Sequence, residues 1–103
     1  MTEQTIRTVA YRSGDWWIIQ GLDYRFVTCT TRFEDVPGEL HRWLLILAYA
    51  SRKYGIEPFH GYKVAPGKFW RLFEEAAPWY PVPSFEFPPE LNFSPTIELR
   101  LLA

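Results

Sequence analysis

Few residues of this sequence have the types and spacing that catalysis requires. His41 lies within a helical pattern and His60 in a loop, and no predicted acid or nucleophile accompanies either one. The acids of Glu34-Asp35 and of Glu74-Glu75 are expected to point apart, because consecutive side chains of a helix or strand lie on different faces. We therefore expect no general acid–base pair and predict that the protein is not an enzyme.

Cysteine and glycine usage gives no sign of a metal or cofactor site. The single cysteine, Cys29, excludes an intrachain disulfide and a cysteine-rich metal site. It falls in the middle of a predicted strand, where a buried and unreactive thiol is the usual finding, and no local motif marks a Cys–His pair. The glycines Gly14, Gly21 and Gly38 form no phosphate-binding pattern. We expect neither a cofactor nor a bound metal.

The dominant element is one long helix, predicted from Asp35 to Gly55. Apolar residues recur there every three or four positions, which gives the helix one face toward a core. The Asp35 carboxylate is expected to cap the first N–H groups, and Pro37 fits only in the first turn. Gly55 is expected to end the helix.

A second face of this helix is also apolar, since Leu45, Ile46 and Tyr49 lie away from the main stripe. Large exposed apolar patches are rare on monomers. Either the later chain covers this face, or a second copy of the protein or another partner does.

Three β-prone segments precede the helix, at residues 5–12, 16–20 and 25–31, with turn residues at 13–15. Both faces of Trp16–Gln20 are apolar, so both need cover, and the helix can cover only one of them. The order predicts an α+β fold, in which a three-stranded antiparallel β-meander carries one long helix on one face.

The rest of the chain is expected to cover what the helix leaves exposed. Residues 68–77 predict a short second helix that ends before Pro78. Residues 78–95 hold six of the nine prolines, interleaved with aromatic residues, and cannot form a central strand. We expect this Pro/aromatic strap to lay its rings on the sheet face opposite the helix or in the groove of a second subunit. Thr96–Leu101 alternates and predicts a final edge strand.

We expect residues 1–77 (the β-β-β-α unit and the short helix) and residues 78–103 (the strap and terminal strand) to form one domain. The polar segment Met1–Arg12 is unlike a signal peptide. The longest apolar stretch, Trp43–Ala50, is too short to span a membrane. These features predict a cytoplasmic protein with no membrane association.

The net charge of −1 argues against broad binding to a phosphate backbone. The charges are nevertheless uneven, because residues 72–103 contain five Glu and one Arg while the rest of the chain is mildly basic. The interpretation we favour is attraction between opposite charges within one fold or across a dimer. The alternative is that the acidic segment faces a basic partner.

The order of these elements resembles the HicB-like antitoxin fold over roughly residues 5–54. The resemblance depends on the segment GDWWIIQGLDY (Gly14–Tyr24), the strands on either side and the acid-capped helix. It implies a partly degraded RNase H-like unit without catalytic acids, which binds and blocks a small mRNA-cleaving toxin. Typical members continue into a DNA-binding domain, whereas this chain has the strap. The segment from Glu57 to Trp70 is similar to stand-alone HicB-like proteins.

We accordingly expect a non-catalytic protein-interaction module of the HicB-like type that sequesters a small basic, toxin-like RNase. Because Trp, Tyr and Arg dominate interface energetics, the predicted partner-binding residues are Trp16, Trp17, Tyr24, Arg25, Trp79 and Tyr80. A homodimer is also expected, with an interface formed by Leu45, Ile46, Tyr49, Phe85 and Phe87.

An alternative function is that of a small nucleic-acid-binding protein. Arginines alternate with aromatic residues along the predicted strands, as on platforms that bind single-stranded RNA; they are Arg7, Arg12, Arg25 and Arg32. Because the strap is expected to cover the rings of this face, a protein partner is favoured over a nucleic acid.

Overall fold

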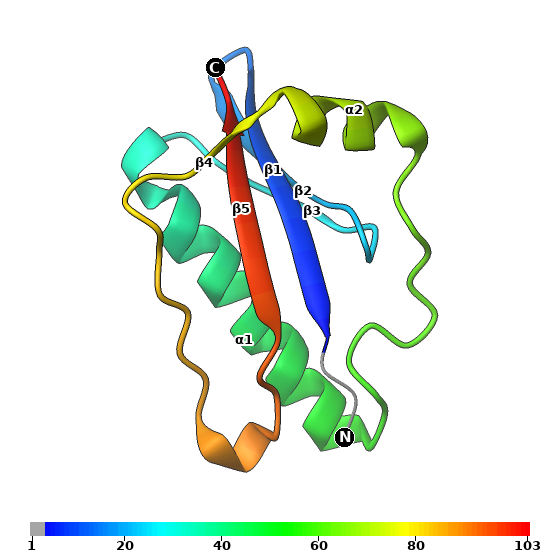
Figure 1. The fold of residues 1–103 in the computed structure, drawn as a ribbon. Coiled ribbons are helices and arrows are strands. Elements are labelled where there is room, and N and C mark those ends of the chain that lie inside the picture. Colours follow the sequence, from blue (N-terminus) through cyan, green and yellow to red (C-terminus); the bar gives the residue numbers. More distant parts are fainter. Residues whose placement is uncertain (1–3) are drawn as a thin grey trace.

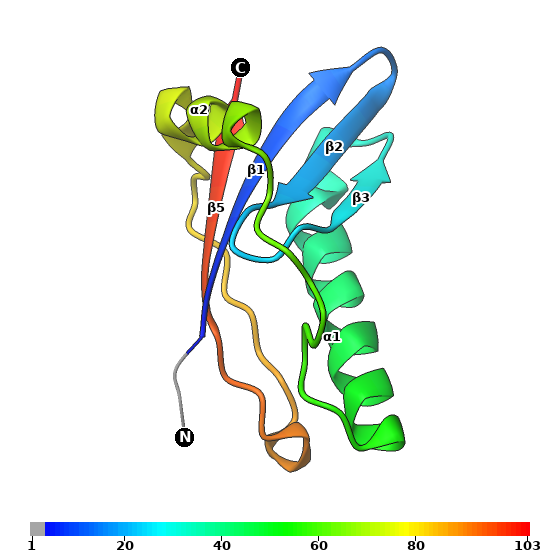
Figure 2. The ribbon, with the colours of Figure 1, turned by 90° about the vertical axis from the view of Figure 1, so that its right-hand side faces the viewer.

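A five-stranded sheet with a long helix across one face forms the frame of the molecule (Figure 1, Figure 2). The computed structural model describes residues 4–103. In chain order its elements are β1 (Thr5–Ser13), β2 (Trp16–Gly21), β3 (Val27–Thr30), the 3₁₀ turn η1 (Phe33–Asp35), α1 (Val36–Tyr54), α2 (Gly67–Glu75), β4 (Ala77–Pro78), the 3₁₀ turn η2 (Pro89–Leu91) and β5 (Thr96–Leu102). The α+β class and both helices are confirmed.

The sheet is larger than the predicted meander and has the strand order β3-β2-β1-β5-β4. β1, β2 and β3 pair antiparallel as predicted, with Gly14 at a φ of 61° in the first turn. The addition is β5, which pairs in parallel with β1 over its whole length, from Thr5 opposite Thr96 to Tyr11 opposite Leu102. β5 is the predicted terminal strand, and only the two-residue β4 lies on its outer side.

One face of the sheet carries the main core. α1 packs over the β2 and β3 side of this face. The buried side chains of α1 recur at helical spacing and meet Ile6, Ala10 and Ile19 of the sheet; they are Val36, Leu40, Leu44 and Ala48. The predicted core stripe of the helix is therefore confirmed.

The opposite face is covered by α2 and not by the strap. Phe73 and Ala76 pack there against Val9 and Leu22 in a second, smaller core. The strap rings Trp79 and Phe93 belong instead to the main core, on the same face as α1. The prediction that the strap fills the face opposite the helix is thus wrong.

The position of α1 explains this arrangement. Since α1 lies over β2 and β3, the β1 and β5 side of the same face needs another cover. The chain leaves β4 beside Leu101, near the end of β5, and must return to Thr96 at its beginning. Figure 1 shows the strap running back along the α1 side, where its rings fill the space that the helix leaves.

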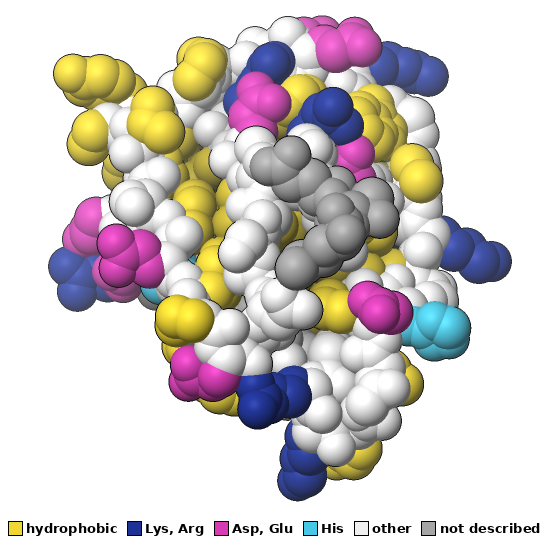
Figure 3. Space-filling view, turned by 60° about the horizontal axis from the view of Figure 1, so that its bottom comes forward, with side chains coloured by type: hydrophobic (Ala, Val, Ile, Leu, Met, Phe, Trp, Pro, Cys, Tyr) yellow, Lys and Arg dark blue, Asp and Glu magenta, His cyan; other side chains and the backbone are white. Residues whose placement is uncertain are grey.

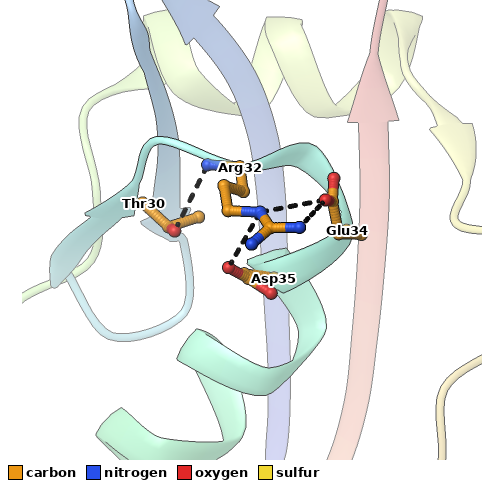
Figure 4. Close-up of polar contacts among 4 residues, drawn as sticks. All are labelled: Thr30, Arg32, Glu34 and Asp35. Atoms are coloured by element: carbon orange, nitrogen blue, oxygen red, sulfur yellow. Dashed lines mark hydrogen bonds and ion pairs between the residues drawn. The ribbon is translucent and has the colours of Figure 1, made fainter.

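The start of α1 differs from the predicted cap. The Asp35 side chain makes no hydrogen bond to the helix N–H groups; its Oδ2 lies 3.8 Å from Arg32 Nε. Arg32 also donates from Nη2 to Glu34 Oε1 at 2.6 Å (Figure 4). The other end is as predicted, because Gly55 has a φ of 66° and its N–H points back to the carbonyls of Ser51 and Arg52.

A polar contact joins α1 to the edge strand β3. Glu39 accepts hydrogen bonds from the Thr28 hydroxyl of β3 and from the Arg42 guanidinium one turn along the helix. The bonds from Arg42, with a smaller contribution from Thr28, hold the pKa of Glu39 below its ordinary value. The Glu39 carboxylate therefore contributes to stability only while it is ionised.

None of the helices in the described part of the chain is long and apolar enough to cross a membrane.

We predict that Glu39→Gln lowers the free energy of unfolding by about 1 kcal/mol at pH 7, because a charge-assisted contact between α1 and β3 is lost. The folded-state pKa of Glu39 lies below its unfolded value of about 4.3, so this contribution is present above that pH and disappears as the pH falls through the folded-state pKa. Urea unfolding of both proteins between pH 3 and 7 measures the difference. Glu34→Gln is the control, because its exposed pair with Arg32 is expected to change nothing measurable.

Candidate functional site

The predicted partner-binding residues do not form one surface. Trp16 and Trp17 are neighbours in β2 and therefore point to opposite faces of the sheet. Trp79 and Tyr80 lie at the end of the sheet near Trp17. Tyr24 and Arg25 follow Gly21, at the other end of β2. The structure thus divides the set into three. Trp17, Trp79 and Tyr80 lie at one end of the sheet, which we call the strap end, and Tyr24 and Arg25 lie at the other end of β2, which we call the loop end. Trp16 lies by itself on the opposite face of the sheet.

At the strap end, three rings pack in sequence. Phe33 stacks on Trp79 with ring centroids 4.7 Å apart, and Trp17 meets Phe33 edge-on at 5.1 Å. Trp79 is only 7% exposed, whereas Tyr80 is 89% exposed and Val82 is 80% exposed. Trp79 therefore anchors the strap to the core, and Tyr80 and Val82 face the solvent.

The strap also carries unpaired acids. Glu86 and Glu90 are exposed, and neither takes part in an ion pair among residues 4–103. We call the exposed side chains Tyr80, Val82, Glu86 and Glu90 the strap surface. Figure 3 shows hydrophobic and acidic side chains on the left of the molecule, with a Lys or Arg side chain beside the acids; Figure 1 places the strap and the start of α1 on this side.

The acidic C-terminal third is not neutralised by the rest of the described chain. Within it, Glu98 pairs with Arg100 at 2.8 Å, so both partners belong to the same segment. Every other ion pair among residues 4–103 joins residues of the N-terminal part. The described ion pairs therefore do not support attraction between the two parts within one fold, which leaves the alternatives of a dimer or a basic partner.

At the loop end, the connection after β2 is held by the loop that follows α1. The Arg25 N–H donates to the Lys63 carbonyl at 2.6 Å, and the Ala65 N–H donates to the Leu22 carbonyl at 2.9 Å. Tyr24 stacks on Phe59 of the same loop at 4.1 Å. These contacts fix the two segments side by side.

A pocket of about 380 Å³ opens between these segments, lined by Arg25, His60, Gly61, Tyr62 and Lys63. Arg25 was predicted from the sequence as a partner-binding residue and His60 was noted as a loop residue, but no contact between their segments was predicted. The segments are joined by backbone hydrogen bonds and by the Tyr24–Phe59 stack, and neither kind of contact leaves a pattern in the sequence that links the two segments.

The remaining sheet face is partly open. α2 contacts β1 and β5, so Trp16, Val27 and Cys29, on the β2 and β3 side, remain exposed. The expectation of a buried thiol at Cys29 is therefore wrong, because the strap that was to cover this face lies on the other one.

The predicted dimer-interface residues are divided between core and surface. Leu45, Phe85 and Phe87 are half-buried against the main core. His41 lies between the two phenylalanine rings, and its Nε2 is 2.6 Å from the Glu86 carbonyl oxygen. The strap thus covers this side of α1. Cover by the later part of the chain was one of the two alternatives that the sequence left open.

Ile46 and Tyr49 remain exposed on the outer side of α1. They are three positions apart and so share a helix face. The prediction of a homodimer interface now depends on these two residues.

Within residues 4–103, no three His, Cys, Asp or Glu side chains gather as metal ligands do. Comparison with models of known protein families, with curated proteins and with solved structures finds no match for this chain.

We predict that Trp79→Ala lowers the free energy of unfolding by about 3–5 kcal/mol, because it leaves a large cavity where the strap meets the core. Tyr80→Ala, at the next position, is expected to change it by less than about 0.5 kcal/mol. Thermal or urea unfolding of both variants tests this difference. Equal stability of the two variants would contradict the assignment of Trp79 to the core.

For the outer side of α1, we predict that a dimer, if it forms there, dissociates when Ile46 and Tyr49 are both replaced by Ser. Light scattering after gel filtration measures the mass of the wild type and the variant. The matched control is Val64→Ser, an exposed apolar residue on the loop after α1. A wild-type protein of one-chain mass, or a variant that keeps a two-chain mass, would contradict an interface at this face.

Proposed function

We propose that this protein is a non-catalytic interaction module of the HicB-like type, which binds a small basic protein through the strap surface. The observation that carries the proposal is the strap surface itself, where the exposed apolar side chains Tyr80 and Val82 and the unpaired acids Glu86 and Glu90 lie along one segment of the chain. Such a surface favours binding of a partner, because exposed apolar area favours association and a basic partner would relieve the repulsion between the acids.

The chemistry of the strap surface specifies the partner. Tyr80 is a large, amphipathic side chain that is almost fully exposed, which makes it suitable as an interface anchor. Glu86 and Glu90 favour a basic partner by electrostatic steering and disfavour an acidic one. A small basic protein with an apolar groove fits both requirements.

The resemblance supports a toxin-like RNase as that partner. The elements on which it depends are present, namely the β1–β2 hairpin, β3 and the long helix α1. The strap stands where typical HicB-like antitoxins continue into a DNA-binding domain. In this proposal the module inhibits its partner by covering the partner's basic RNA-binding surface with the strap surface.

The structure gives less support to nucleic-acid binding along the sheet. Arg7 pairs with Asp23 at 2.6 Å, and Arg32 pairs with Glu34 at the start of α1. Arg12 donates to the Gly14 carbonyl in the first turn. Three of the four arginines therefore have partners within the fold; the fourth, Arg25, lies in the connection between β2 and β3 and not on a strand.

We predict that the tagged protein retains one small basic protein from its host's lysate at near-equal stoichiometry. The double variants Tyr80→Ser/Val82→Ser and Glu86→Lys/Glu90→Lys are each expected to reduce the retained amount at least tenfold, because they remove the anchor and reverse the charge. Quantitative mass spectrometry of the retained proteins measures this. Purified partner then allows a test of RNase inhibition.

The matched controls are Val64→Ser and Glu57→Lys, which make the same types of change on the loop after α1. These variants should retain the partner as the wild type does. Retention of no partner by the wild type, or equal retention by the strap variants, would refute the proposal.

A further inference from the structure

The pocket at the loop end has a chemistry that the strap surface lacks. Four of its five residues, Arg25, His60, Tyr62 and Lys63, have side chains that can donate a hydrogen bond, and Arg25 and Lys63 are cationic. No acidic side chain lines the pocket. The pocket therefore presents a local concentration of positive charge on a protein whose net charge is −1.

The two cations of the pocket have no side-chain partner within the described part of the chain. Neither Arg25 nor Lys63 takes part in a side-chain hydrogen bond or an ion pair among residues 4–103. The nearest acid in sequence, Asp23, accepts from both the backbone N–H and the guanidinium of Arg7. Asp23 is therefore already engaged and does not neutralise Arg25.

The backbone holds these cations together. The hydrogen bond from the Arg25 N–H to the Lys63 carbonyl places the two residues opposite one another. Gly61 lies between His60 and Tyr62 with a φ of 82°, and no protein atom lies near the position that a Cβ would take there. Its N–H has no acceptor among residues 4–103.

We propose that this pocket binds the phosphate group of a nucleotide. Arg25 and Lys63 are the cations that phosphate oxygens prefer, and Arg25 can donate in the bidentate manner. The volume of about 380 Å³, in a site that opens widely to solvent, exceeds what a bare phosphate needs. Tyr62, which is 39% exposed, provides an aromatic side chain for the base.

Two kinds of ligand present such a phosphate group. One is a free mononucleotide, and the other is a single-stranded nucleic acid with a terminal phosphate. The pocket has two cations, which suits a single phosphate group. The residues of this site are separate from those of the strap surface.

The experiment is a titration of the ¹⁵N-labelled full chain at low salt, followed by amide shifts. The probes are AMP, adenosine, inorganic phosphate and a short single-stranded RNA with and without a 5′-phosphate. We expect AMP to shift the amides of Gly61, Tyr62 and Lys63, and to bind at least tenfold more tightly than adenosine. A phosphorylated RNA that binds more tightly than AMP identifies a strand end as the ligand, and the reverse order identifies a free nucleotide.

The variants Arg25→Gln and Lys63→Gln are each expected to weaken AMP binding roughly tenfold, since each removes a charge-assisted hydrogen bond. Tyr62→Leu should weaken AMP but leave inorganic phosphate unchanged. The matched controls are Arg71→Gln on α2 and Lys53→Gln on α1, which remove the same charge from exposed positions outside the pocket.

The proposal is overturned if adenosine binds as tightly as AMP, if the pocket amides do not shift with any phosphate probe, or if the control variants weaken binding as much as the pocket variants. Because Arg25 and Lys63 lie outside the strap surface, failure here leaves partner capture by the strap untouched. Failure of partner capture likewise leaves this titration unaffected.

Discussion

The parallel pairing of β5 with β1 is the constraint on which the rest of the structure depends. Two parallel strands cannot be joined by a tight turn, so the chain between them must cross from one end of the sheet to the other. Here that crossing contains β2, β3, both helices and the strap. It places the C-terminal strand next to the first strand of the chain, with Thr8 fully buried between its neighbours and its hydroxyl bonded to the Glu98 carbonyl. The acidic C-terminal segment is thereby an integral part of the sheet.

This pairing also determines which surfaces remain free. Because β4 meets β5 near its end, the strap must return along the molecule, and Trp79 and Phe93 bury their rings beside α1 as it does so. Where the strap buries a large side chain such as Trp79 in the core, the neighbouring side chain, here Tyr80, is exposed to solvent. The same return path leaves the β2 and β3 side of the opposite face without cover, where Trp16 and Cys29 are exposed.

The sequence was sufficient where the signal is local. Helical spacing, Gly55 and the turn at Gly14 gave the long helix and the first hairpin, because each depends on residues a few positions apart. It was insufficient for long-range pairing: alternation in residues 96–101 indicates a strand but not its neighbour, so the face taken by the strap was mispredicted. The cap at Asp35 failed for a different reason, because the 3₁₀ turn Phe33–Asp35 gives Asp35 a φ of −89° and a ψ of −4°, whereas a capping residue has an extended backbone. The loop-end pocket depends on backbone hydrogen bonds between segments some forty positions apart, and only the structure brings Arg25 to Lys63.

The separation of charge then has a physical consequence for binding. The strap surface carries Glu86 and Glu90 and the pocket carries Arg25 and Lys63, and none of these four side chains takes part in an ion pair among residues 4–103. In the two proposals each surface favours a ligand of the opposite charge, because attraction between unlike charges steers the ligand that binds there. A basic protein is favoured at the strap surface and a phosphate at the pocket, and the residues named for the two sites do not overlap. Variants of one site therefore leave the charges of the other site unchanged.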